Sequence, residues 1–233
     1  MMDLTPLFEY IDESIEDRIE QIFTSLPGHV IEFDPDTGLV KVQPGIQRVW
    51  GEKEEIIKPA PIVEVPLQIY GGSDYYVECE INYGDEGLIV FSQRCIDAWV
   101  QSGGIATKVS NRMFDETDAF FIPGVHSIQN RAKGHSNNGI RLRNKSGDKF
   151  IHLKNDGSAQ IDVTRLTVNA QTTINGDTTI NGNTSISKSL TVAQTVKAAT
   201  INALSSLLVK GLEMLGHKHG GVEPGKGTTG GPQ

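Results

Sequence analysis

The sequence predicts an all-β protein that begins with one helix, continues as a small barrel and ends as a fibre of intertwined chains. Three observations carry this prediction. Apolar residues recur at helical spacing over residues 1–25, short alternating segments separated by Pro, Gly and Asp turns fill residues 26–125, and a six-residue repeat starts at Thr167. Each pattern indicates a different local structure, because helices and strands bring side chains to one face with different periods.

Composition narrows the range of functions. The chain has 233 residues and a net charge of −8. Nucleic-acid binders gain much of their affinity by neutralising phosphates with Lys and Arg, so we expect no nucleic-acid partner. The start "MMDLTPLFEY" lacks a basic signal-peptide segment, and no apolar run is long enough for a transmembrane helix. We therefore expect synthesis in the cytoplasm.

Residues 1–25 predict an acidic amphipathic helix. Its apolar residues recur at steps of three and four: Phe8, Ile11, Ile15, Ile19 and Ile22. This stripe allows two interpretations. The helix packs on its own domain, or it docks on a partner or on copies of itself, since isoleucine at both core positions favours trimers and larger bundles.

Residues 26–125 predict a small antiparallel barrel. The segments "HVIEF" and "LVKVQ" flank "DPDTG", which is a hairpin signal. In "YVECEI", alternation places Val77, Cys79 and Ile81 on one face of a further strand. "YGDEG" then turns into the apolar strand "LIVF". About five short strands over roughly 100 residues favour an OB-fold domain.

Residues 126–165 are polar and predict a connecting β segment. Their apolar residues suffice for two or three short strands. The three histidines, His126, His135 and His152, have no partner at ligand spacing, so we expect solvated or hydrogen-bonded imidazoles there.

Residues 166–215 predict the shaft of the fibre, and a repeat of six residues fills its first part, residues 167–196. Its units are "TVNAQT", "TINGDT", "TINGNT", "SISKSL" and "TVAQTV", and the second residue is aliphatic each time: Val168, Ile174, Ile180, Ile186 and Val192. β-Branched residues beside Asn-Gly turns predict strands. One aliphatic per unit cannot close a core within one chain, and the strand edges would stay unpaired. We therefore expect identical chains wound together, three of them forming a triangular prism, with a disordered spacer as the alternative.

Residues 201–215 are richer in apolar side chains than the repeat. This segment could form a short helix or a wider turn of the same fibre, and periodicity does not decide between them.

Residues 216–233 predict a metal-binding apex. In an extended segment His217 and His219 point to the same side. Three chains would then supply six imidazoles around one axis, which suits octahedral iron, or nickel as a substitute, rather than tetrahedral zinc. Without a trimer, two solvated histidines would be the better interpretation.

The sequence contains no convincing catalytic set, so we expect no enzymatic activity. "GGVEPGKGT" is similar to a phosphate-binding loop, but Gly227 stands where a Ser or Thr would be needed to reach Mg²⁺.

The order of these parts resembles the central spike protein of contractile phage tails, of the baseplate assembly protein V type with an N-terminal OB domain. The resemblance rests on "LPGHVIEFDPDTGLVKVQP" (26–44), "YGDEGLIVFSQRCIDAWVQSGG" (83–104), "DAFFIPGV" (118–125) and "HKHGGVEPGKGTTGGPQ" (217–233). It spans nearly the whole chain.

The resemblance implies a homotrimer at the tip of the tail baseplate in the virion. OB domains would sit on the baseplate hub protein, a triple-stranded β-helix would form the shaft, and one iron ion per trimer would be held on the three-fold axis by His217 and His219. Sheath contraction would drive this spike through the host outer membrane, a transient and mechanical contact. The chain lacks the lysozyme domain that some spikes insert between barrel and shaft.

A different class remains as an alternative, a trimeric β-solenoid adhesin or a polysaccharide-degrading tailspike. Such a protein would need aromatic grooves and paired carboxylates on its shaft, and residues 166–215 contain no Trp, Tyr or Phe.

Overall fold

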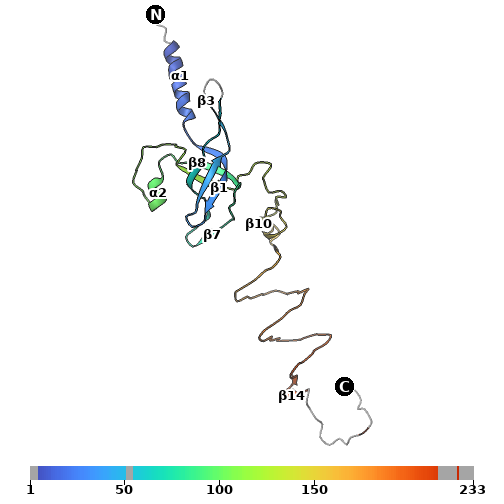
Figure 1. Ribbon diagram of the computed structural model, residues 1–233. Coiled ribbons are helices and arrows are strands. Elements are labelled where there is room, and N and C mark those ends of the chain that lie inside the picture. Colours follow the sequence, from blue (N-terminus) through green and yellow to red (C-terminus); the bar gives the residue numbers. More distant parts are fainter. Residues whose placement is uncertain (1–4, 51–54, 215–224, 226–233) are drawn as a thin grey trace. The chain divides into compact units, whose positions relative to one another are not determined.

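The computed structural model describes residues 5–50, 55–214 and 225. The chain divides into two units, Met1–Thr167 and Val168–Gln233, which are described separately. Strands outnumber helices in the described part (Figure 1), so the predicted all-β class is confirmed. The trimer and the β-helix stay predictions, because the structure contains one chain.

Helix α1 (Thr5–Glu20) opens the first unit. Pro6 lies in its first turn, where the missing N–H costs no helical hydrogen bond. After the helix ends, the Ile22 amide donates to the Ile19 carbonyl at 3.0 Å. All side chains from Phe8 to Ile22 are exposed, so the helix does not pack on the described residues of its own domain.

Five strands form the main sheet of the first unit. They are β1 (Ser25–Asp34), β2 (Leu39–Pro44), β5 (Ile62–Pro66), β8 (Glu86–Phe91) and β9 (Ala119–Pro123), in the order β5-β2-β1-β8-β9. Neighbouring strands are antiparallel. Leu67, just after β5, forms a parallel bridge with Phe121 of β9, and the Gln68 amide donates to the Phe121 carbonyl at 2.8 Å. The two outer strands therefore approach each other and the sheet curls into a half-barrel (Figure 1).

The core of this unit lies inside the curled sheet. Alternation along each strand sends every second side chain inward, and the buried apolar residues are Val30, Val40, Val42, Ile62, Val65, Ile89, Phe91, Ala119 and Phe121. Gly28 and Gly87 face each other across β1 and β8. A Cβ atom on Gly87 would lie 2.4 Å from the Phe121 ring, so the glycine leaves the space that this ring fills.

The β1–β2 hairpin confirms the prediction made from "DPDTG". The Asp34 carboxylate accepts from the Asp36 amide at 2.9 Å and from the Thr37 hydroxyl at 2.7 Å. Gly38 completes the turn at φ 70°, a conformation that glycine adopts without strain. The hydrogen bonds from Thr37 and Asp36 also lower the pKa of Asp34.

The strand predicted from "YVECEI" is wrong beyond Val77. Strand β7 (Tyr75–Val77) pairs only with the three-residue strand β6 (Tyr70–Gly72), and residues 78–82 form no strand. The chain instead turns toward β8, with the Asn82 amide donating to the Asp85 carboxylate at 2.8 Å. Alternation of side chains was present, but no neighbouring strand pairs with the backbone there.

Shorter elements complete the first unit. Strands β3 (Arg48–Trp50) and β4 (Glu55–Ile57) form a second hairpin, and α2 (Asp97–Ser102) lies between β8 and β9. A separate sheet then follows with the order β10 (Ile140–Arg143), β11 (Phe150–Leu153), β12 (Ala159–Asp162). It confirms the short strands predicted for residues 126–165.

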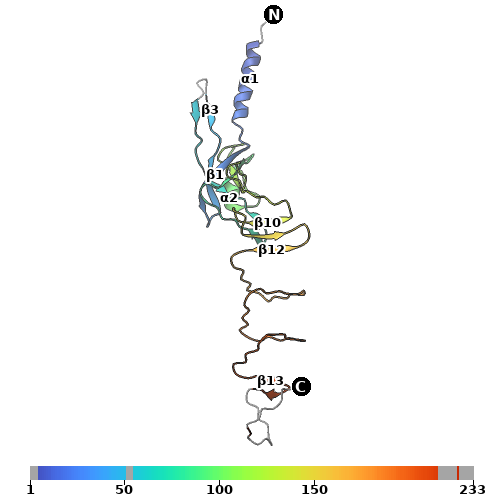
Figure 2. The same ribbon diagram turned by 90° about the vertical axis from the view of Figure 1, so that its right-hand side faces the viewer.

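The second unit contains little regular structure. Residues 168–207 form no helix or strand, and their trace runs back and forth in extended legs (Figure 2). Strands β13 (Leu208–Val209) and β14 (Leu212–Glu213) then make a small hairpin. Lys210 and Gly211, at φ 50° and 83°, form its turn with both central residues at positive φ, as in type I′ turns. The described residues 201–214 therefore contain a hairpin and no helix, and the wider turn of the fibre stays a prediction.

Candidate functional site

The predicted metal ligands His217 and His219 lie outside the described residues. The structure therefore does not place them, and the iron site stays a prediction.

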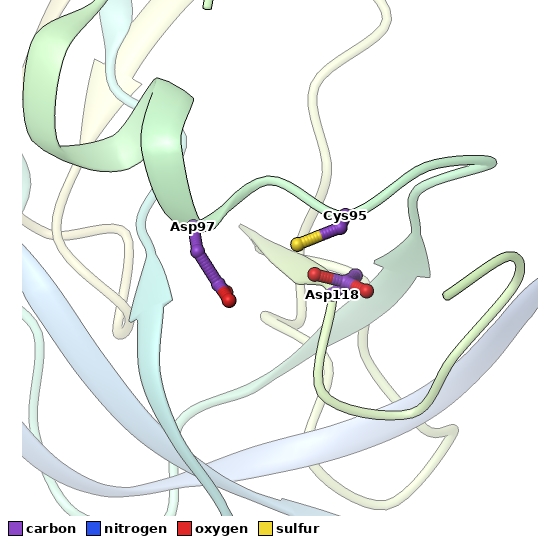
Figure 3. Close-up of side chains that lie close together, drawn as sticks. All are labelled: Cys95, Asp97 and Asp118. Carbon is purple, nitrogen blue, oxygen red and sulfur yellow. The ribbon is translucent and has the colours of Figure 1, made fainter. Parts of the chain in front are cut away.

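One cluster with metal-ligand chemistry does lie within the described part of the chain. Cys95, Asp97 and Asp118 bring their sulfur and carboxylate oxygens within 4.8 Å of one another (Figure 3). Cys95 lies in the loop after β8, Asp97 begins α2, and Asp118 directly precedes β9. The sequence does not single out these residues, because only the fold brings Asp118 to Cys95 and Asp97, which lie far before it in the chain.

The guanidinium of Arg112 holds this cluster together. Its Nε donates to Asp118 Oδ2 at 3.0 Å, and its Nη2 approaches Asp118 Oδ1 at 3.0 Å, Asp97 Oδ1 at 2.8 Å and Cys95 Sγ at 3.2 Å. The Ile96 amide also donates to Asp118 Oδ1 at 3.0 Å. A metal ion at this point would have to displace the Arg112 guanidinium, which already contacts both carboxylates and the sulfur, so the arrangement favours an ion pair that ties the α2 loop to β9 over a metal site.

The protonation states fit an ion pair. Burial alone would raise the pKa of Asp118, but the hydrogen bonds from Arg112 and the Ile96 amide, with the arginine charge, lower it below its ordinary value. The two aspartates in turn raise the pKa of Arg112. A backbone hydrogen bond from Asp97 favours the Cys95 thiolate, but burial and the nearby carboxylates outweigh it, so the pKa of Cys95 is raised. The thiol therefore stays protonated and unreactive at neutral pH.

The β10–β12 sheet carries an unpartnered apolar surface. Residues opposite one another in antiparallel strands share a face, and Ile140 pairs with Leu153 while Ile151 pairs with both Leu142 and Ile161. All five of these side chains are exposed. We call this surface, made by Ile140, Leu142, Ile151, Leu153 and Ile161, the apolar face. Sequence analysis found these strands but not the face, since the face depends on the register between them.

The opposite side of the same sheet makes contacts within the chain. The Arg141 guanidinium lies 3.8 Å from the centroid of the Phe150 ring, and buried His152 hydrogen-bonds to the Asn138 carbonyl. Arg143 donates to a set of loop carbonyls at 2.6–3.0 Å: Lys133, Gly134, Asn144 and Lys145. These contacts fix the loops against one side and leave the apolar face as the open side.

The six-residue repeat presents a second set of unpartnered apolar side chains. Its members, Val168, Ile174, Ile180, Ile186 and Val192, are each at least two-fifths exposed. The legs that carry them form no β pairing among the described residues. Exposed aliphatics on unpaired extended backbone leave both the hydrophobic effect and backbone hydrogen bonding unsatisfied in a single chain.

The comparison with protein-family models addresses the barrel. Residues 26–124 match the model of the phage protein Gp138 N-terminal domain. This likeness supports a phage tail or baseplate type of protein with a structural, virion-associated role. The matched range ends directly after β9, so it includes neither the apolar face nor the repeat. The comparison with curated proteins finds no match.

Proposed function

We propose that this chain is the central spike of a contractile phage tail, a homotrimer that stands on the baseplate hub protein. The observation that carries the proposal is the row of exposed aliphatics at six-residue spacing on unpaired legs. Three copies wound about one axis would bury that row and pair the legs with each other, giving a triple-stranded β-helix. The phage-type domain at residues 26–124 supports the setting in a tail.

The barrel is the part of this spike that we expect to attach to the hub protein. Its strand order β5-β2-β1-β8-β9, with a parallel contact between the outer strands at Leu67 and Phe121, supports the proposal of an OB-type barrel. The net charge of −8 of the whole chain favours a protein partner over nucleic acid. We infer that the barrel acts as the adaptor to the hub.

The proposed mechanism is mechanical. Contraction of the sheath drives the spike through the host outer membrane, and the shaft must resist bending and fraying. No helix of the described part of the chain has the length and apolar character needed to cross a bilayer. The role needs none, because the spike passes through the membrane instead of residing in it. At the tip, His217 and His219 from three chains would hold one iron ion and keep the chain ends together.

Replacing Ile180 with Asp tests the shaft. The change would place three carboxylates at one level of the fibre axis without counter-ions, at a cost of several kcal/mol each. We expect wild-type mass in solution to be three times the chain mass of 25.4 kDa, and the variant to melt at lower temperature and dissociate. Light scattering after size exclusion and thermal unfolding measure both.

The neighbouring substitution Thr179→Asp is the matched control. Adjacent residues of an extended leg point to opposite sides, so this charge would face solvent and leave the trimer intact. A monomeric wild-type protein, or an Ile180→Asp variant that stays trimeric with unchanged melting, would contradict the shaft proposal.

A further inference from the structure

Helix α1 presents an apolar stripe that its own domain leaves open. Its members, Phe8, Ile11, Ile15, Ile19 and the following Ile22, are 41–60% exposed. Helical spacing places them within one narrow arc of the surface. A stripe of this kind is normally buried, so its exposure indicates a missing partner.

The charges of the helix are arranged to one side of this stripe. At about 100° per residue, Asp12 and Glu16 border the stripe on one flank, and Glu9, Glu13, Asp17 and Glu20 continue away from it. The other flank carries uncharged Tyr10, Ser14 and Gln21 together with Arg18. The helix thus has an apolar centre, one acidic edge and one nearly neutral edge.

This pattern destabilises the helix when it stands alone. Carboxylates repeat at four-residue spacing in pairs such as Glu9 with Glu13 and Glu16 with Glu20, and like charges at that spacing repel. Asp17 and Glu20 also lie in the last turn, where the helix dipole disfavours negative charge. At 16 residues, α1 is barely longer than the ~12–15 residues below which an isolated helix is marginal in water. A partner that supplies positive charge would offset this electrostatic repulsion.

Charge decides which partner fits. Copies of α1 side by side would bring together six carboxylates and one arginine from each chain, with little to neutralise them. An anionic membrane surface would repel the helix for the same reason. We propose that α1 docks in an apolar groove with a basic rim along one side, on a separate baseplate protein. The inference rests on the proposed function, which makes the hub protein that partner.

The test uses the full-length protein and the purified hub protein of the same baseplate as the probe. Isothermal titration at several salt concentrations compares wild type with Ile11→Asp/Ile15→Asp. We expect the double variant to lose at least about 10-fold in affinity, because each isoleucine would be buried at the centre of the contact. Wild-type affinity should fall as salt rises, since salt screens attraction between the acidic edge and the basic rim.

Two matched charge variants test the one-sided rim. Asp12→Asn/Glu16→Gln removes two charges beside the stripe, and Glu13→Gln/Asp17→Asn removes two on the distant side. The first should weaken binding and its salt dependence, and the second should change affinity less than about two-fold. Helical circular dichroism should show that all three double variants keep the helix when bound.

The outcomes separate this inference from the proposed function. If wild type binds the hub and Ile11→Asp/Ile15→Asp binds equally well, α1 is not the docking element and the spike proposal stands. If the trimer shows no hub binding at any salt, the hub partnership itself fails, and the inference with it. Salt screens the repulsion within a single helix in every variant. If added salt raises the helical signal of the unbound wild type but not that of Ile11→Asp/Ile15→Asp, copies of α1 pair with each other and the inference is overturned.

Discussion

At the scale of single residues, the Arg112 cluster shows how one cation serves acceptors of very different burial. The Asp118 side chain is fully buried, whereas that of Asp97 is 56% exposed. A buried carboxylate without partners is costly, and Asp118 has three donor atoms directed at it. We therefore assign most of the stabilisation in this cluster to Asp118.

Replacing Asp118 with Asn should lower the free energy of unfolding by about 3 kcal/mol. The amide NH₂ would face either Arg112 or the Ile96 amide, both donors, and leave the arginine with its exposed partner alone. The matched change Asp97→Asn should cost less than about 1 kcal/mol, because its ion pair is in contact with water. Urea unfolding monitored by circular dichroism checks both.

The pH dependence gives this prediction a second readout. The pKa of Asp118 is lowered in the folded protein from an ordinary value of 3.8, so its contribution is fully present above that value. The contribution is lost as pH falls below 3.8 through the lower folded pKa. Wild type should therefore lose more stability than Asp118→Asn over this acid range, and parallel acid profiles would contradict the assignment.

At the scale of elements, the apolar face of the β10–β12 sheet indicates that this sheet takes part in contacts between chains. Three short strands with one apolar side fold stably only when that side is covered. Arg141, Arg143 and Phe150 make contacts within the chain on the opposite side of the sheet. A covering partner must therefore bind to the apolar face. The exposed repeat requires a partner for the same reason, and one trimer would satisfy both.

Replacing Ile161 with Asp should weaken assembly without unfolding the barrel. Ile161 belongs to the apolar face, and the charge would enter the proposed contact between chains. Gln160→Asp is the control, since Gln160 is exposed, adjacent in β12 and directed to the opposite side. Sedimentation velocity at several concentrations should show dissociation of the first variant only. Equal dissociation of both variants would mean that the face is not part of the contact.

Sequence reasoning succeeded where the controlling contacts are local. The turn "DPDTG" specifies the β1–β2 hairpin through its own Asp34 and Gly38, and the helical spacing of apolar residues predicted α1. It failed where a distant partner decides. "YVECEI" alternates as a strand does, yet no neighbour pairs with residues 78–82. Arg112 and Asp118 were missed because only the fold brings the α2 loop onto β9.

At the scale of the whole molecule, the part of the chain that matches the family model and the parts that follow it differ in whether a single chain can bury their apolar residues. The barrel at residues 26–124 has its own buried core and a family-model match. The parts that follow have exposed apolar surfaces and, in the repeat, unpaired legs. We infer that the barrel folds first within each chain and that the shaft forms only when three chains meet. Pairing between chains forms late, because it must first overcome the entropy cost of bringing separate segments together.

The metal tip is the last prediction at this scale. Purified trimer should contain one iron ion per three chains, measured by elemental analysis against protein concentration. Replacing both His217 and His219 with Ala should remove the metal and leave the trimer assembled, because in the proposed trimer the shaft and the apolar face would supply most of the buried surface. Neutral imidazole is the ligand form, so lowering pH toward and below about 6.5 should release the metal.

The exposed histidines His126 and His135 provide the control, since replacing both with Ala removes the same number of imidazoles from another part of the chain. That variant should keep its iron, and its affinity for iron should equal that of the wild type at every pH. Six imidazoles on an enclosed axis should also retain iron against a chelator far longer than a surface site of two does. Iron absent from the wild-type trimer, or retained after loss of His217 and His219, would remove the metal from the mechanism and leave the shaft alone to hold the chain ends together.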